Sequence, residues 1–200
     1  ELNKNLKQFF LKKKIWCASS THQNEEKICL EVHKKLKLKY KDLLTIIIPR
    51  HIHRTKEILN EIKKLGLKVH LHESKNNISN KIDIYLVNSF GQTKSFFKIC
   101  KTIFLGGSII KHGGQNPLEP VRYGCKILHG PNVWNFDEIY TLLKKYKITS
   151  KVYNSKQLFL KVNEMLIKKN KPKILEHKFI NLGNKILNST LKEMNLYIVK

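Results

Sequence analysis

Arginine and acidic residues are both scarce in this sequence of 200 residues. Only three of the 39 basic residues are arginine, namely Arg50, Arg54 and Arg122, and 15 acidic residues leave a net charge of +24. Proteins that read nucleic-acid sequence favour arginine, because its guanidinium forms two parallel hydrogen bonds with a base. The lysines are instead dispersed along the chain beside many asparagines and isoleucines, which indicates a coding bias. The composition therefore argues against nucleic acid as the partner.

Paired cysteines and long apolar runs are also absent. The four cysteines (Cys17, Cys29, Cys100 and Cys125) form no CxxC pair, so the sequence predicts buried free thiols rather than a zinc site or a disulfide framework. The longest apolar run, at 43–48, is far shorter than the roughly 20 residues that a membrane-spanning helix needs. At 41% hydrophobic residues, the chain can form one domain with a core, which excludes a disordered protein.

Short β-branched or apolar runs alternate with longer helical patterns along the chain. This alternation predicts a single doubly wound, Rossmann-like α/β domain with a mostly parallel sheet of about six strands. Residues 1–13 are interpreted as a linker or helical lead-in, 14–169 as the main domain and 170–200 as a helical tail. Strands are predicted at 14–18, 43–48, 67–71, 82–87, 101–105 and 126–129, with a further short one at 151–153, and helices at 25–38, 53–64, 91–100, 135–147 and 155–169.

Glycine and proline are unevenly distributed. Seven of the nine glycines and three of the five prolines fall between positions 91 and 131. In open α/β sheets, ligands bind beyond the carboxyl ends of the strands, where glycine lets backbone N–H groups approach an anion. Four loops are expected at that edge: 19–22, which begins with a polar turn at 19–21, and 49–53, 88–92 and 106–119. A tight turn explains any one glycine pair, but the clustering favours a binding site.

The segment NPLE at 116–119 has two interpretations. As structure it begins a helix, with Asn116 at the N-cap, Pro117 at N1 and Glu119 reaching back in a capping box. Pro120 would then stand at N4, where it removes the first intrahelical donor and disfavours helical dihedrals at Glu119. This defect favours the second interpretation, in which the carboxylate of Glu119 accepts hydrogen bonds from the paired hydroxyls of a ribose.

Histidines stand in or near three of the four predicted site loops. The H-x-H pair His51 and His53 is not predicted to bind a metal, because no carboxylate or cysteine accompanies it at ligand spacing. His22 and His112 are better candidates for function, since a protonated ring can stabilise a carboxylate or a phosphate. A structural hydrogen bond is the alternative for each of them.

The run GGSIIKHGGQNPLEPVRYGCKILHGP, which begins at Gly106, resembles the signature of the 3-deoxy-D-manno-octulosonic acid (Kdo) transferases. The stretches ASSTHQNEE at 18–26 and IIIPRH at 46–51 support the resemblance, which covers about residues 14–169. These enzymes transfer Kdo from CMP-Kdo to the lipid A precursor of Gram-negative bacteria. The resemblance implies the C-terminal, donor-binding half of a two-domain GT-B glycosyltransferase. The half that binds the acceptor and supplies the catalytic base has no counterpart in these 200 residues.

The resemblance also implies a CMP site without a metal or cofactor and without a catalytic residue in this chain. Arg50 is expected to meet the cytosine carbonyl or a phosphate, the N–H groups of the Gly91 loop the phosphate, and Glu119 the ribose. Asn88 and Gln92 replace acidic residues that are usual in the family. The implied CMP contacts are Pro49, Arg50, Phe90, Gly91, Gln92, Asn116, Pro117, Leu118 and Glu119. Further candidates for contacts with the donor and its phosphate are Ser19, Ser20, His22, Gly107, Ser108, His112, Gly113 and Gly114.

The expected partners follow from the same resemblance. They are CMP-Kdo or CMP, the lipid A precursor (lipid IVA) through the other half of the enzyme, and an anionic membrane surface, with no nucleic acid. The expected location is the cytoplasmic face of the bacterial inner membrane, where lysines near an anionic surface contribute about 1 kcal/mol each. The alternatives are another GT-B nucleotide-sugar enzyme, such as an epimerase or a different glycosyltransferase, or a basic module that binds nucleic acid or anionic lipid.

Overall fold

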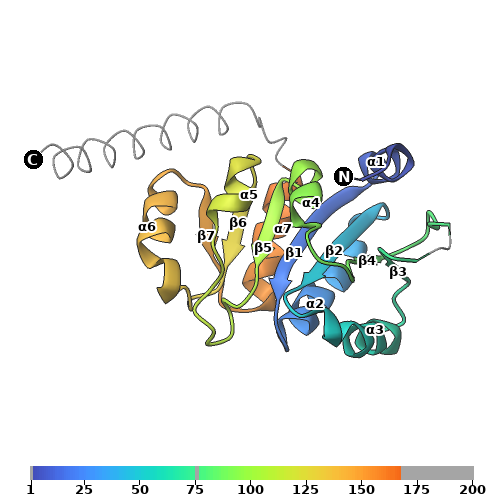
Figure 1. Ribbon diagram of the computed structural model, residues 1–200, viewed down its shortest axis with the longest axis horizontal. Helices are drawn as coiled ribbons and strands as arrows, with labels where there is room; N and C mark the ends of the chain where they lie inside the picture. Colours follow the sequence, from blue (N-terminus) through green and yellow to red (C-terminus); the bar gives the residue numbers. More distant parts are fainter. Residues whose placement is uncertain (1, 75–76, 168–200) are drawn as a thin grey trace, which may run out of the picture.

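The chain folds around a seven-stranded parallel sheet (Figure 1). The computed structural model describes residues 2–74 and 77–167, so the tail predicted at 170–200 lies outside the described residues. The strand order is β3-β4-β2-β1-β5-β6-β7, and every neighbouring pair is parallel. The doubly wound α/β prediction is confirmed, with seven strands where about six were predicted. The strands are β1 (Lys14–Thr21), β2 (Leu43–Pro49), β3 (Val69–Leu71), β4 (Ile84–Leu86), β5 (Thr102–Leu105), β6 (Lys126–His129) and β7 (Thr149–Lys151).

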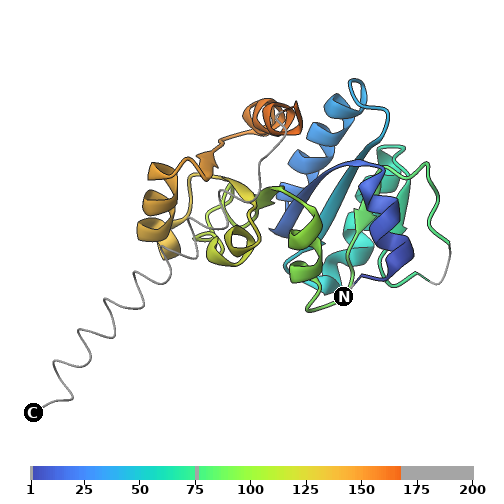
Figure 2. The ribbon, with the colours of Figure 1, turned by 90° about the horizontal axis from the view of Figure 1, so that it is seen from above.

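Helices cover both faces of the sheet (Figure 1, Figure 2). Because both faces are covered, the central strands are apolar nearly throughout, and all seven residues of β2 are buried. Trp16 and Ala18 pack toward one helical layer, while Cys17 between them packs toward the other. The first layer is α2 (Glu25–Lys37), α3 (Thr55–Lys64) and α7 (Ser155–Ile167), and the second is α1 (Lys4–Leu11), α4 (Thr93–Ile99), α5 (Leu118–Arg122) and α6 (Asp137–Lys145).

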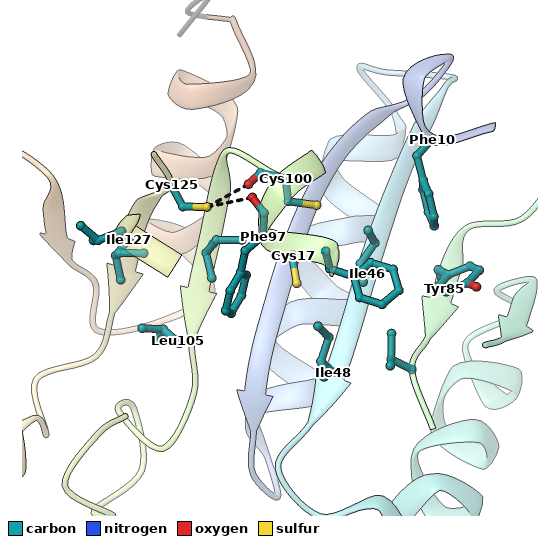
Figure 3. Close-up of a cluster of buried hydrophobic side chains, with 14 of the residues drawn as sticks. Phe10, Cys17, Ile46, Ile48, Tyr85, Phe97, Cys100, Leu105, Cys125 and Ile127 are labelled. Atoms are coloured by element: carbon teal, nitrogen blue, oxygen red, sulfur yellow. Dashed lines mark hydrogen bonds between the residues drawn. The ribbon is translucent and has the colours of Figure 1, made fainter. Parts of the chain in front are cut away.

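The core beneath α1 and α4 is rich in aromatic rings and thiols (Figure 3). Phe10 packs edge-on against Tyr85 and Phe96, with ring centroids 5.1 and 6.0 Å apart. The thiol of Cys125 donates to the carbonyls of Phe97 and Cys100 across 3.3 and 3.1 Å. All four cysteines are buried and free, which confirms the prediction from their spacing.

The polar turn predicted at residues 19–21 is wrong. The strand β1 continues to Thr21, which pairs with Pro49 at the end of β2, while the carbonyl of Ser19 accepts from the N–H of Gly106 across 2.9 Å. Neighbours on both sides thus hold the backbone extended even though the side chains are polar. Ser20 has a φ of 56°, and the register shifts there, so the segment is a bulge within a strand.

Candidate functional site

A cavity of about 180 Å³ lies at the carboxyl edge of the sheet. The strand β1 has β2 on one side and β5 on the other, so the chain order reverses direction there. Open α/β sheets bind ligands at such a switch point, because the connections on its two sides diverge. The lining residues are Ser20 from β1, Leu105 from β5, Thr93 and Phe97 from α4, and Gln115, Asn116, Glu119 and Pro120 from the segment that begins α5.

Three of the residues predicted from the sequence line this cavity, namely Ser20, Asn116 and Glu119. Gln115 lies in the same predicted loop and was not singled out, although its position between Gly114 and Asn116 was a usable signal. Phe97 and Leu105 gave no signal, because an apolar residue that lines a cavity has the same pattern as one in the core. The sequence therefore predicted the polar side of the cavity and missed its apolar floor.

The helix α5 begins one residue later than predicted. The N–H of Val121 makes the first intrahelical bond, to the carbonyl of Pro117 across 3.3 Å, which places Pro120 at N3 where no donor is needed. Asn116 stands one residue before the N-cap Pro117, and its Oδ1 accepts from the N–H of Leu118 across 2.9 Å. Within the described part of the chain the side chain of Glu119 makes no hydrogen bond, so the reciprocal half of the predicted capping box is not formed. Its carboxylate lines the cavity instead.

The loop after β5 is organised by the buried carboxylate of Glu25, which lies at the start of α2 and was not among the predicted site residues. Its Oε2 accepts from the N–H groups of Gly107 and His22 across 2.7 and 3.0 Å. Its Oε1 accepts from the N–H groups of Ser108 and Ile109 across 3.0 and 2.9 Å. The side chain is fully buried at the start of α2. The amides of Gly107 and Ser108 are therefore held by an internal anion, which corrects the expectation that they would be free for a phosphate.

The other glycines of this loop also serve its packing. The N–H of Gly114 donates to the carbonyl of Gly107 across 2.8 Å, and the N–H of Asn135 donates to the carbonyl of Gly113 across 3.2 Å. Gly113 and Gly114 have φ of 93° and 80°, and a methyl group on Gly114 would meet Val133 at 3.0 Å. Backbone conformation and close packing therefore explain these glycines without a ligand.

Two of the implied CMP segments flank the cavity rather than line it. Pro49 is the buried last residue of β2, and the exposed Arg50 after it donates its N–H to the carbonyl of Thr21 across 2.9 Å. Phe90 is 79% exposed, and Gln92 directly precedes Thr93, which does line the cavity. Both segments therefore adjoin residues of the cavity region, since Thr21 follows Ser20 and Thr93 follows Gln92.

Asn88, which replaces an acid usual in the family, has a structural contact. Its Oδ1 accepts from the N–H of Glu73 across 3.0 Å and so links the ends of β4 and β3. Gly91 follows in the same loop with a φ of 73°, a conformation that favours glycine.

The predicted histidine candidates meet at the same edge. The rings of His22 and His112 lie 4.1 Å apart, and the ring of His51 lies 5.5 Å from that of His22. Nδ1 of His22 is 3.1 Å from the carbonyl of Ser20, which accepts only, so this nitrogen carries the proton. Burial lowers the pKa of His22, the neighbouring His112 lowers it further, and the carboxylate of Glu25 raises it.

Helix α6 supports the cavity from the side of β6. The hydroxyl of Tyr140 donates to the carbonyl of Gln115 across 3.0 Å, and its ring lies 4.3 Å from that of the buried His129. Nδ1 of His129 donates to the carbonyl of Gly130 across 2.7 Å. Burial lowers the pKa of His129 to about 4, the lysines at 144 and 151 lower it as well, and the bond to Gly130 opposes them.

Acidification is therefore expected to destabilise the protein through His129. Its pKa is about 4 when folded and about 6.5 when unfolded, so the unfolded state binds more protons between these values. The contribution of His129 to the free energy of unfolding is fully present above about pH 6.5, and about 3 kcal/mol of it is lost as the pH falls toward 4. Urea unfolding at several pH values should show a shallower decline in His129→Gln. The exposed His53→Gln is the control, and an unchanged slope in His129→Gln would contradict the assignment.

Residues 2–74 and 77–167 contain no group of three or more histidines, cysteines or acids placed to hold a metal ion. In the same part of the chain, no helix combines the length and apolar character needed to cross a bilayer.

Similarity to known proteins agrees with this geometry, although no protein-family model matches the chain. The chain is 36% identical over 130 residues to the 3-deoxy-D-manno-octulosonic acid transferase of Haemophilus influenzae, covering 64% of this chain and 30% of that protein. It is 30% identical over 206 residues to a probable mitochondrial 3-deoxy-D-manno-octulosonic acid transferase of Arabidopsis thaliana. That match covers 98% of this chain and 46% of the Arabidopsis protein. The chain thus spans less than half the length of these relatives.

Its fold matches the crystal structure of the C-terminal CMP-Kdo binding domain of WaaA from Acinetobacter baumannii. The TM-score is 0.80 at 23% identity, over 88% of this chain and 93% of that one. The doubly wound sheet with its cavity at the switch point is thus the fold of that domain, which is the class of one half of a GT-B fold. Within that class, the chain is similar over nearly its whole length to Kdo transferases, and its fold matches that of their C-terminal domain. The matches do not favour the alternatives of an unrelated GT-B enzyme or a basic nucleic-acid module.

Proposed function

We propose that this chain binds CMP-Kdo and forms the donor half of an enzyme that transfers Kdo to the lipid A precursor. The observation that carries the proposal is the cavity at the switch point, where Glu119 and Asn116 face Ser20. An unpaired carboxylate at such a mouth suits the paired hydroxyls of a ribose. The membrane acceptor and a location at the cytoplasmic face of the inner membrane belong to the same proposal, as does contact between the lysines and anionic lipid.

The transfer is a displacement at the anomeric carbon of Kdo, in which the bond to the phosphate oxygen breaks and CMP leaves with the electron pair. An acceptor hydroxyl forms the new bond, and its proton goes to a base outside this chain. The chain's own residues hold the leaving group, with Glu119 on the ribose. Since Glu25 and Gly107 hold the loop amides of Gly107, Ser108 and Gly114, the phosphate charge is assigned to Arg50 and the Gly91 loop. Donors fixed there stabilise the charge that develops on the leaving phosphate.

Glu119→Ala is expected to weaken CMP binding about 10- to 100-fold, because hydrogen bonds to a charged group contribute about 1.5–3 kcal/mol. Isothermal titration calorimetry with the whole chain measures this loss. The exposed Glu138→Gln, on α6, is the matched control and should bind as the wild type does.

A deoxyribose ligand separates the ribose contact from a general electrostatic effect. With 2′-deoxy-CMP, wild type and Glu119→Ala should differ much less than with CMP, since one of the paired hydroxyls is missing. Absence of binding at millimolar CMP, or equal losses for both ligands, would contradict the assignment.

A further inference from the structure

The histidine cluster beside the cavity is not accounted for by nucleotide binding. His22, His51 and His112 come from the loops after β1, β2 and β5, and His53 stacks on His51 with ring centroids 5.5 Å apart. Three separate loops thus bring imidazole rings to one point at the carboxyl edge. The acid that faces His22 is Glu25, whose two oxygens are already committed to four N–H groups.

Gly107 connects this cluster to the cavity. A methyl group on its Cα would lie 3.2 Å from His112 Cδ2, 3.2 Å from His22 Cε1 and 3.3 Å from Gln115 Nε2. The two rings and the amide therefore surround one point, and Gln115 also lines the cavity. Ser20, the residue whose carbonyl holds His22, lines it too. The histidine pair thus adjoins two residues that line the cavity, Ser20 and Gln115.

His22 contains an unsatisfied polar atom in this position. The side chain is more than nine-tenths buried, and Nε2 has no hydrogen-bond partner among the described residues. Because Nδ1 donates to Ser20, Nε2 has a lone pair when the ring is neutral and becomes a donor only when the ring is protonated. Buried polar atoms in folded proteins are almost always paired, so an unpaired one beside a cavity indicates a missing ligand. His112, which lies against this ring, is exposed and free to turn toward a ligand.

We propose that His22 and His112 form an anion subsite that binds the carboxylate of the donor sugar. This inference rests on the proposed function. In a CMP-linked octulosonic acid, the carboxylate is bonded to the carbon that also carries the phosphate, so two anionic groups lie side by side. The histidine pair binds the carboxylate, while Arg50 and the Gly91 loop bind the phosphate. Binding brings a proton onto His22 from the solvent, since only the protonated ring donates from both nitrogens.

The charged and titratable groups around His22 set the direction of this linkage. Glu25 from α2 favours the protonated ring, while His112 and His51 from the two neighbouring loops disfavour it. A carboxylate placed between the rings adds a negative charge and so favours proton uptake. Affinity for the carboxylate should therefore increase as the pH falls from 8 to 6.

The test compares three ligands by calorimetry on the whole chain: CMP, a non-hydrolysable 2-deoxy analogue of CMP-Kdo, and the same analogue with a carboxamide in place of the carboxylate. At pH 6, the wild type should bind the carboxylate analogue about tenfold more tightly than the carboxamide analogue, and binding should take up protons. At pH 8, this ratio of affinities should be smaller. His22→Gln and His112→Gln should each reduce this ratio to about twofold or less while their CMP affinity stays within about twofold. His70→Gln, on the distant edge strand β3, is the matched control and should keep the ratio.

The outcomes separate the subsite from the proposed function. Normal CMP binding with an unchanged carboxylate ratio in both variants would overturn the subsite and leave the nucleotide site standing. Absence of CMP binding by the wild type would overturn both the subsite and the proposed function. CMP affinity also reports whether each variant is folded, so a variant that loses CMP together with its cooperative urea transition is replaced by His22→Asn or His112→Asn.

Discussion

Glu25→Gln is expected to lower the free energy of unfolding by about 2–6 kcal/mol, although the change is isosteric. Each carboxylate oxygen accepts two backbone N–H groups, from His22 and Gly107 on one oxygen and from Ser108 and Ile109 on the other. A glutamine offers one acceptor, and its NH₂ group must face two donors. Two buried N–H groups then lose their partner, at about 1–3 kcal/mol each. The midpoint of urea unfolding measures the loss.

The control for Glu25 is on the same helix. Glu31→Gln removes the same charge from a partly exposed position of α2 and should change stability by less than about 0.5 kcal/mol. Glu25→Leu should cost more than Glu25→Gln, since it removes both acceptors. Equal stability of Glu25→Gln and Glu31→Gln would show that the carboxylate does not hold the loop.

Gly130→Ala is expected to destabilise the protein by about 3 kcal/mol or more. A methyl group on Gly130 would overlap the carbonyl of Ser108 and the N–H of Ile109, which are backbone atoms and cannot rotate away. The two segments are also tied together, because the N–H of Gly130 donates to Ser108 Oγ across 2.8 Å and the N–H of Asn132 donates to the carbonyl of Ser108 across 2.9 Å. The loop after β5 must therefore move, so CMP affinity should fall together with stability.

Gly66→Ala is the comparison for this second prediction. Gly66 ends α3 with a φ of 70° and has nothing within 4 Å of an added methyl group. Only the left-handed conformation is then costly, at about 1–2 kcal/mol, and CMP binding should not change. If Gly130→Ala were no more destabilising than Gly66→Ala, the close approach of the two backbones would be disproved.

Most of the sheet could be predicted from the sequence, because strands covered on both faces are short apolar runs bounded by glycine, proline or charge. The end of β1 could not be predicted in this way. Residues 19–21 are polar and read as a turn, but pairing with β2 and with the loop after β5 holds them as a bulged strand. Tertiary pairing is not visible in local composition, so strand ends at a polar site are where such prediction fails.

The candidate site was predictable in location but not in detail. Glu119 was identified from a defect in a presumed helix start and Asn116 from the family resemblance, yet the helix begins one residue later, so Pro120 removes no intrahelical donor. Glu25 was missed because an acid at a helix start has an ordinary explanation in the helix dipole. The carboxylate of Glu25 contacts residues 107–109, more than 80 positions away, because β1 and β5 are neighbours in the sheet.

The Glu25 carboxylate acts as a ligand that never dissociates. Because it is part of the chain, the loop after β5 keeps its shape at any nucleotide concentration, and no free energy is needed to order it when the donor arrives. Binding that needs no loop ordering is expected to associate quickly and to leave the backbone of residues 106–109 unchanged between the free and bound states. Amide hydrogen exchange of residues 107–109 should accordingly be slow with or without CMP, whereas changes on binding concentrate at the exposed side chains around the cavity mouth.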